Sequence, residues 1–312
     1  MKKYKLTEET IIVNGRTLYR IEALRDFAYI KKGDKGGFVE KENNLSQYGD
    51  SWVDDDAKVF GNAQVCGNAR IYGNAIVRGN AQVYGHASVR GNAEVYGHAD
   101  ICGDAQVYDE AKVYDYAEVY DNAEVLGNAE VYDNAKVFEN AKVCGNVEVY
   151  GKAQVYDDAL VCEDAQVYGY AWVCGDARVY GDARVFENAT ISSNANVCDN
   201  AMVRGKANVY SHADIRGDAE ITADTDYIVF KNWWSSGRFF IWTRSNNMWS
   251  VGCFYGTGKE LIDKAYKDSE ISGKEYKRVV DYVNSIKDNK YNHVRKNIKE
   301  RLLSKMRKLF VK

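Results

Sequence analysis

An aliphatic residue recurs at every sixth position from Val53 to Ile221 without a slip, which makes 29 consecutive occurrences. Two positions before each aliphatic residue stands a small one, and from Ala57 to Ala219 it is Ala everywhere except at Val147. Pairs such as Gly61-Asn62, Asp121-Asn122 and Gly181-Asp182 stand two and three positions after the aliphatic residue. A strict short period indicates a solenoid, in which each unit buries its apolar face against its neighbours.

The chemistry of the unit predicts short parallel strands. Alternate residues of a strand face the same side, so the Ala and the aliphatic residue two positions later both point inward. Gly, Asn and Asp at the second and third positions after the aliphatic residue tolerate the left-handed backbone of a tight corner. Three strands then close an 18-residue coil, and we expect an all-β left-handed parallel β-helix of about ten coils. Val-rich units broken by Gly and Asn exclude an α-solenoid.

Charge and composition divide the chain into three predicted parts. Residues 1–52 form an N-terminal β cap, 53–224 the β-helix, and 225–312 a small α+β module. The β-helix holds 13 Lys and Arg against 28 Asp and Glu, a net charge of −15, whereas residues 225–312 carry +10. An acidic solenoid with a basic C-terminal part is therefore expected.

The N-terminal segment combines a hairpin signal with a recognisable motif. Asn14-Gly15 between β-prone runs predicts a hairpin that covers the first coil. Further on, Gly33-Asp34-Lys35-Gly36-Gly37-Phe38-Val39-Glu40, Asn44-Leu45-Ser46 and Gly49-Asp50-Ser51-Trp52-Val53 follow one another. This series resembles the entry segment of YdcK-like hexapeptide-repeat proteins of bacteria and their phages, and the resemblance extends over about residues 20–222. It implies a β-solenoid on a phage or prophage and brings no established activity.

Four of the six tryptophans lie in the C-terminal part, where they are predicted to form the core of a small sheet and a binding surface: Trp233, Trp234, Trp242 and Trp249. Strands are expected at 227–231, 238–243 and 248–253, and helices at 259–267, 274–286 and 291–310. The last helix is amphipathic and basic. We expect it to dock within the protein or in an oligomer; nucleic acid and an anionic membrane are the alternatives.

The 18-residue register sorts the outward side chains into columns. One column holds six aromatic residues in succession with an arginine at each end: Arg78, Tyr96, Tyr114, Tyr132, Tyr150, Tyr168, Phe186 and Arg204. We call the six aromatic residues the aromatic ladder. The column is predicted to be an exposed contact face, because Tyr and Arg are enriched at binding surfaces. The alternative is that stacked rings only stabilise adjacent strands.

The residues that catalysis would need are scattered. His86 and His212 share a column but lie seven coils apart, roughly 33 Å, and His98 stands in another column. The unbroken phase leaves no loop to form a pocket. Cys144 and Cys162 are neighbours but lack metal-site spacing. We therefore expect no enzyme, metal or cofactor; an acyltransferase with a site between subunits is the alternative.

These patterns predict a rigid binding protein. We expect it to bind and block, or scaffold, a host protein, with a protein of an anti-phage defence system as one candidate, and to form a homo-oligomer. The dense carboxylates leave open a DNA-mimicking inhibitor, although direct nucleic-acid binding is not expected. No run of 18 apolar residues, no signal peptide and an odd number of cysteines favour a cytoplasmic protein without membrane contact.

Overall fold

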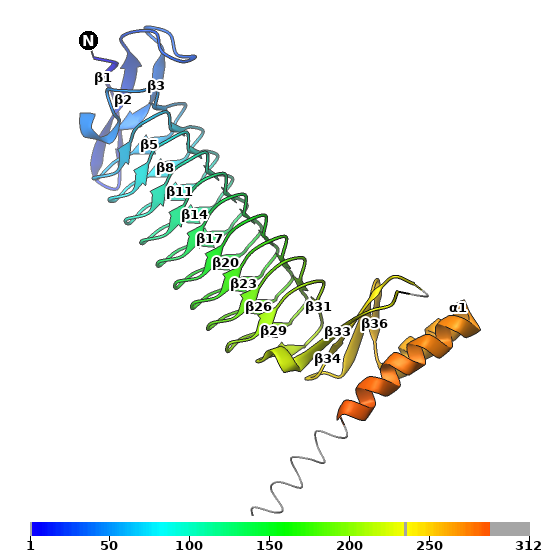
Figure 1. Ribbon diagram of the computed structural model, residues 1–312. Helices are drawn as coiled ribbons and strands as arrows, with labels where there is room; N and C mark the ends of the chain where they lie inside the picture. The colour runs from blue at the N-terminus through cyan, green and yellow to red at the C-terminus, as the bar shows by residue number, and fades with distance from the viewer. Residues whose placement is uncertain (1, 234–235, 288–312) are drawn as a thin grey trace, which may run out of the picture. The chain divides into compact units, whose positions relative to one another are not determined.

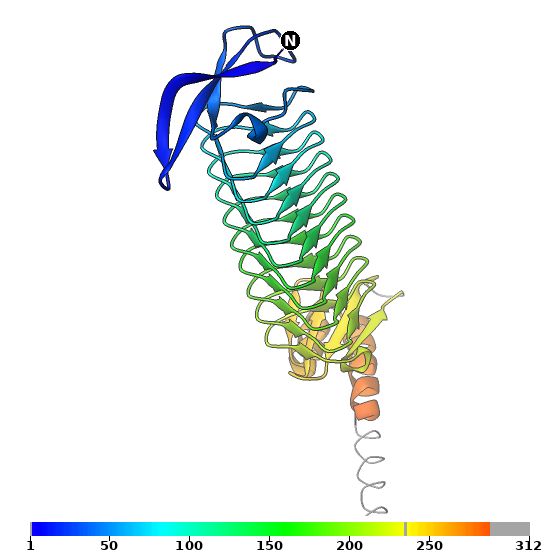
Figure 2. The same cartoon turned by 90° about the vertical axis from the view of Figure 1, so that its left-hand side faces the viewer.

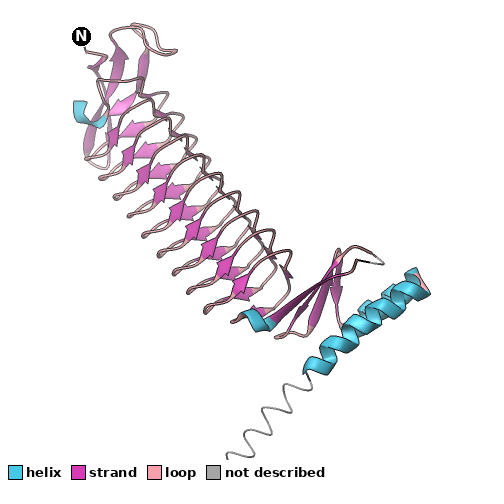
Figure 3. Cartoon of the chain, in the orientation of Figure 1, coloured by secondary structure: helices cyan, strands magenta, loops and turns pink. Residues whose placement is uncertain are grey.

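The structure, a computed structural model, describes residues 2–233 and 236–287. The chain divides into two compact units, the first made of residues 1–227 with 243–246 and the second of 228–242 with the residues from 247 onwards. Most of the first unit is a parallel β-solenoid of about ten coils, so the predicted solenoid fold is confirmed. Figures 1 and 3 show its strands stacked coil upon coil.

Each coil contributes one two-residue strand to each of three parallel sheets, which we call the first, second and third faces. The first face contains β5 (Lys58–Val59), β8 (Ile76–Val77), β11 (Glu94–Val95), β14 (Lys112–Val113), β17 (Glu130–Val131), β20 (Glu148–Val149), β23 (Gln166–Val167), β26 (Arg184–Val185), β29 (Met202–Val203) and β32 (Glu220–Ile221). The second contains β6 (Gln64–Val65), β9 (Gln82–Val83), β12 (Asp100–Ile101), β15 (Glu118–Val119), β18 (Lys136–Val137), β21 (Gln154–Val155), β24 (Trp172–Val173), β27 (Thr190–Ile191) and β30 (Asn208–Val209). The third contains β4 (Trp52–Val53), β7 (Arg70–Ile71), β10 (Ser88–Val89), β13 (Gln106–Val107), β16 (Glu124–Val125), β19 (Lys142–Val143), β22 (Leu160–Val161), β25 (Arg178–Val179), β28 (Asn196–Val197) and β31 (Asp214–Ile215).

The strands of a face pair in register at a spacing of 18 residues, as between Val131 and Val149. The Ala and aliphatic positions of the repeat point inward, and they are almost completely buried throughout the solenoid. Side chains of matching shape therefore stack along a continuous interior, as the sequence predicted.

The two corner positions have different roles, which the sequence did not distinguish. The first takes the left-handed conformation, as at Gly85 (φ 69°) and Asp121 (φ 55°), where Gly, Asn and Asp are least strained. The second does not; its side chains instead bond from coil to coil. The Asn122 amide, for example, donates to the Asn140 side-chain oxygen at 3.0 Å. Asn is therefore used there for a side-chain ladder rather than for its backbone freedom.

Backbone hydrogen bonds around each strand run in one direction along the solenoid. The Lys58 N–H donates to the Ala75 carbonyl at 2.9 Å, and at the corner the Asn62 N–H donates to the Gly79 carbonyl at 2.7 Å. Each of these donors points to the next coil. The first coil consequently presents carbonyl groups that need donors, and the last coil presents N–H groups that need acceptors.

Three strands precede the repeats: β1 (Tyr4–Val13), β2 (Arg16–Ala23) and β3 (Lys35–Val39). β1 and β2 form the predicted antiparallel hairpin, whose turn residues Asn14 and Gly15 have positive φ. β3 pairs antiparallel with β2 and parallel with β5, so the first face continues into the hairpin. Figure 2 shows the hairpin reaching back beside the first coils.

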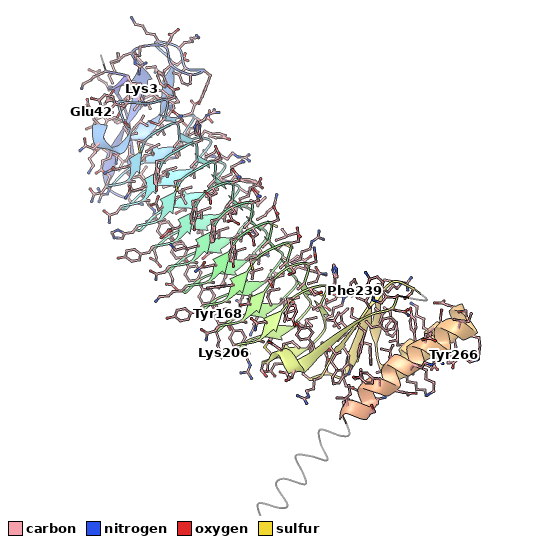
Figure 4. All side chains as sticks on the ribbon, in the orientation of Figure 1. Lys3, Glu42, Tyr168, Lys206, Phe239 and Tyr266 are labelled. Carbon is pink, nitrogen blue, oxygen red and sulfur yellow. The ribbon has the colours of Figure 1, made fainter. Side chains whose placement is uncertain are left out.

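Donors from the N-terminal segment satisfy the carbonyls of the first coil. The Asn44 amide, at the end of the 3₁₀ turn η1 (Glu42–Asn44), donates to the Ala63 carbonyl at 2.8 Å. The Lys3 ammonium, labelled in Figure 4, donates to the Ser51 carbonyl at 2.7 Å and is completely buried. Burial, and secondarily the nearby Arg25, lowers the pKa of Lys3 to about 8. The buried Lys3 ammonium thus supplies a hydrogen-bond donor to the carbonyl groups at this end of the solenoid.

Acceptors satisfy the N–H groups of the last coil. The Asn208 N–H donates to the Asp224 carboxylate at 2.7 Å, from the 3₁₀ turn η2 (Asp224–Asp226). The Glu220 N–H donates to the Ser245 hydroxyl at 2.7 Å. The two ends are therefore closed by opposite chemistry, as the direction of the backbone bonds requires.

The second unit is built on the four-stranded sheet β33 (Tyr227–Lys231), β34 (Phe239–Thr243), β35 (Met248–Val251) and β36 (Phe254–Gly256), followed by the helix α1 (Gly258–Asp268) and a helix over 270–287. The sequence did not predict β36 as a separate strand. Trp242 and Trp249 lie in the buried core, as predicted. Trp233 is 73% exposed, so its predicted core position is wrong; Trp234 and the helix expected at 291–310 lie outside the described residues.

Within residues 2–233 and 236–287, no helix is both long enough and apolar enough to span a bilayer.

We predict that the contribution of Lys3 to stability rises with pH. Because its pKa is lowered in the folded state, the unfolded chain holds the Lys3 proton more strongly between pH 8 and 10.5, so this contribution to the free energy of unfolding increases over that window. Thiols with a raised pKa, such as Cys162, act in the opposite direction, so the contribution is measured as the difference between wild type and Lys3→Met. In urea unfolding this difference should grow in favour of wild type by on the order of 1 kcal/mol from pH 8.0 to 9.5. The exposed neighbour gives the control, Lys2→Met, whose pH curve should stay parallel to that of wild type. Parallel pH curves for wild type and Lys3→Met would contradict the assignment.

Candidate functional site

The aromatic ladder forms one continuous stack on the first face. Each ring lies over the equivalent ring of the next coil, with centroids 4.8–5.0 Å apart and interplanar angles of 1–4°. Tyr168, labelled in Figure 4, is the fifth ring of the six. The in-register strands impose this spacing, because equivalent residues of parallel strands repeat at the strand separation.

Both arginines at the ends of the ladder pair with the glutamate of the next coil. Arg204 donates from Nε to Glu220 Oε1 at 2.7 Å, and Arg78 makes the equivalent but longer contact with Glu94, at 3.4 Å. The Arg78 guanidinium also lies 4.0 Å from the Tyr96 ring centroid and continues the stack as a cation–π contact.

The rings are half-buried rather than fully exposed, because each lies against its neighbours and along the sheet. Tyr114 donates its hydroxyl to the Glu130 carboxylate at 2.9 Å, and Glu130 also accepts from Lys112 at 2.9 Å. Burial and then the Glu130 carboxylate raise the pKa of Tyr114, while the bonded Lys112 lowers the pKa of Glu130. Stacking covers the ring faces, so the surface presents ring edges beside a column of charged side chains.

The protein's own hairpin already covers the start of this column. Phe60 stands one coil before Arg78 in the same register and is buried together with Leu18 and Phe38. Ile11 and Val13 of the hairpin pack against the same cluster. The start of this column therefore packs against an apolar β-hairpin of the same chain.

Shorter stacks occur elsewhere. Tyr120, Phe138 and Tyr156 stack on the second face with centroids 4.9 Å apart. On the third face, the Arg90 guanidinium lies 4.1 Å from the Tyr108 ring. Stacking is thus a general consequence of the coil register, and the first face is distinguished by the length of its ladder.

Three exposed aromatic residues near the corner between the first and second faces were missed by the sequence reasoning. Tyr116 and Tyr170 stand at the corner and are 59% and 56% exposed, and Trp172 of β24 is 46% exposed, so they offer more surface than the ladder rings. Tyr116 stacks on His98 with centroids 4.8 Å apart, and the Lys152 ammonium lies 5.2 Å from the Tyr170 ring. For Tyr116 and Tyr170, the available signal was an aromatic residue where the repeat otherwise places Asn or Asp.

The histidines and cysteines that the structure describes are spread along the solenoid and in the second unit. His86 and His98 lie in the corner side-chain ladders, 3.3 and 3.2 Å from the amides of Asn68 and Asn80. Among the described residues, no group of three or more His, Cys, Asp or Glu could hold a metal ion. Burial raises the pKa of Cys162 to about 11, which keeps its sulfur a thiol at neutral pH.

Carboxylates gather at the corner between the second and third faces. An open groove of about 420 Å³ is lined by Asp104, Asp121, Glu139, Asp157 and Asp158, with Asn122 and Asn140 between them. The neighbouring Asp157 carboxyl raises the pKa of Glu139, as expected for like charges stacked on successive coils. The acidic side chains follow one straight edge, which differs from the helical path of phosphates in duplex DNA.

Comparison with protein families agrees with the fold. Residues 63–79, 153–169 and 177–193 match the family model described as the YdcK β-solenoid repeat. A search of curated proteins gives no match to the chain. The resemblance to YdcK-like proteins is thereby confirmed, and it is carried by the repeats.

We predict that neighbouring ladder rings are energetically coupled. In a double-mutant cycle of Tyr114→Ala and Tyr132→Ala, the coupling free energy should be roughly 0.5–1.5 kcal/mol, because the rings stack at 4.9 Å. The matched control is a cycle of Tyr114→Ala with Tyr150→Ala, whose rings are two coils apart and should couple weakly. Chemical unfolding measures both, and equal coupling in the two cycles would contradict direct stacking.

Proposed function

We propose that this YdcK-like β-solenoid protein is a rigid, non-enzymatic binding protein that holds a partner protein against its first face, over the aromatic ladder. One observation carries the proposal: at Phe60, two coils before Tyr96 in the same column, the surface already packs against an apolar β-hairpin of the same chain through Ile11, Val13 and Leu18. The partner segment would continue that contact along the ring edges from Tyr96 to Phe186.

The ladder suits an extended segment of a partner. Six rings at this spacing reach over roughly 25 Å, about the length of seven or eight residues in a strand. The ring edges supply apolar contact, and the adjoining charged column, which includes Glu94, Lys112, Glu130 and Glu148, supplies a polar rim. Such a rim favours correctly charged partners and opposes others.

Rigidity strengthens the proposal. Each of the four inner rings, Tyr114 to Tyr168, stands on a buried, hydrogen-bonded strand and between two stacked neighbours, so its rotamer is fixed before a partner arrives. Binding to a preorganised surface avoids the entropy loss of ordering flexible side chains. A surface of this kind holds a partner in place and needs no reactive group.

The resemblance to proteins of bacteria and their phages supports a host protein as the partner, with blocking or scaffolding in the host cytoplasm as the effect. The exposed Trp233, which has the Lys231 ammonium 4.2 Å from its ring, gives the second unit a contact point of its own. Exposed tryptophans frequently anchor protein interfaces.

Three glutamines at equivalent repeat positions test which face binds. Gln166 lies on the first face, Gln154 on the second and Gln106 on the third, and all three are half-buried. A photo-crosslinking amino acid at each position, followed by capture from host extract and mass spectrometry, should join one and the same protein from position 166 only. Equal crosslinking of that protein from all three faces would disprove the first-face assignment.

A further inference from the structure

β1 is the terminal strand of the sheet that includes the first face. In the strand order it is bonded to β2 on one side, and on its other side the described residues supply no further strand. A free strand edge carries unpaired N–H and C=O groups, which form a template for another strand.

Only the first half of β1 is protected against such pairing. The register between β1 and β2 is irregular between Leu6 and Thr10, and the exposed Glu8 and Glu9 add charge there. Irregular pairing and charged side chains are the usual protections of an edge strand.

The second half, Thr10 to Val13, has none of these protections. It reads Thr-Ile-Ile-Val, four β-branched residues with no charge and no proline. Ile12 is 78% exposed, whereas its neighbours Ile11 and Val13 pack on the Phe60 cluster. In this part of β1 the register with β2 is unbroken, the side chains carry no charge, and the outer backbone edge is not paired with another described strand.

We infer that a second copy of this chain pairs antiparallel with β1 along residues 10–13, around a two-fold axis at Ile12. In that register Ile12 faces Ile12 of the other copy, and Ile11 faces Val13. The side chains that pack toward the ladder column then lie on one face of the joined sheet, whereas a slip by one residue would turn them to the opposite face.

The segment is self-complementary, which favours a second copy over an unrelated chain. It carries no charge that would select an oppositely charged partner, and each apolar side chain meets an apolar side chain in the symmetric register. The pairing uses the backbone edge and Ile12, not the ladder rings. The pairing of two copies can therefore be confirmed or refuted independently of the proposed binding function.

A cysteine on the two-fold axis tests the register directly. In a Cys253→Ser background, which removes the exposed native thiol, Ile12→Cys should form a disulfide-linked dimer with oxidised glutathione. Directly opposed residues of an antiparallel pair have Cα atoms about 4.5–5.5 Å apart, within disulfide range. Thr10→Cys, which would face Asn14 of the other copy, is the control and should form no disulfide-linked dimer. Equal crosslinking of both variants, or none from Ile12→Cys, overturns the register.

The mass of the full chain tests the association itself. Sedimentation should detect a dimer at concentrations up to about 100 μM, in the affinity range of small interfaces. Ile12→Lys should weaken dimerisation at least about tenfold, since it places two like charges on the axis. Ile271→Lys, at an equally exposed isoleucine of the second unit, is the matched control and should dimerise as wild type does. A wild-type monomer at the highest concentration, or an Ile12→Lys dimer of unchanged strength, refutes the inference.

Discussion

The in-register hydrogen bonding of one coil to the next is the interaction on which the rest of this structure depends. It fixes an 18-residue repeat, so every side chain stands directly over an equivalent one. The interior then becomes columns of Val and Ala, the corners become columns of Asn and Asp, and the surface becomes columns of rings. Because the corner and flanking donors all point toward the next coil, the ends must differ, with the Lys3 ammonium at one end and the Asp224 carboxylate at the other.

The fold could be predicted from the sequence because the six-residue period reports directly on the backbone. The limits of this prediction from sequence also have physical causes. Val39 and Leu45 already pair with Val59 and Val65 of the coil strands. Two extra residues between Leu45 and Val53 break the six-residue spacing, so the sequence pattern does not show that Val39 and Leu45 belong to the repeat. Asn was assigned to the corner for its backbone freedom, although at the second corner position its amide bonds coil to coil, a contact between residues 18 apart.

The sequence predicted which residues form the column of the candidate site, but it did not predict how their side chains pack or how exposed they are. Counting by 18 found the rings from Tyr96 to Phe186 without error. Counting could not show that the rings lie face to face and half-buried, since that depends on side-chain rotamers and on carboxylates of the next coil such as Glu130. Nor could it show that Phe60 is covered by the hairpin, because Leu18 and Phe60 are far apart in the sequence. That contact shows which type of segment packs at the start of the column.

Hydroxyl-radical footprinting of the protein with a captured partner tests most directly whether the first face is the binding surface. Oxidation of tyrosines is read residue by residue, and the three faces carry tyrosines at equivalent positions. We predict that Tyr114, Tyr132 and Tyr150 become protected, while Tyr108 and Tyr180 of the third face are oxidised as in the free protein. Protection of the third-face tyrosines with unchanged oxidation of the ladder would contradict it.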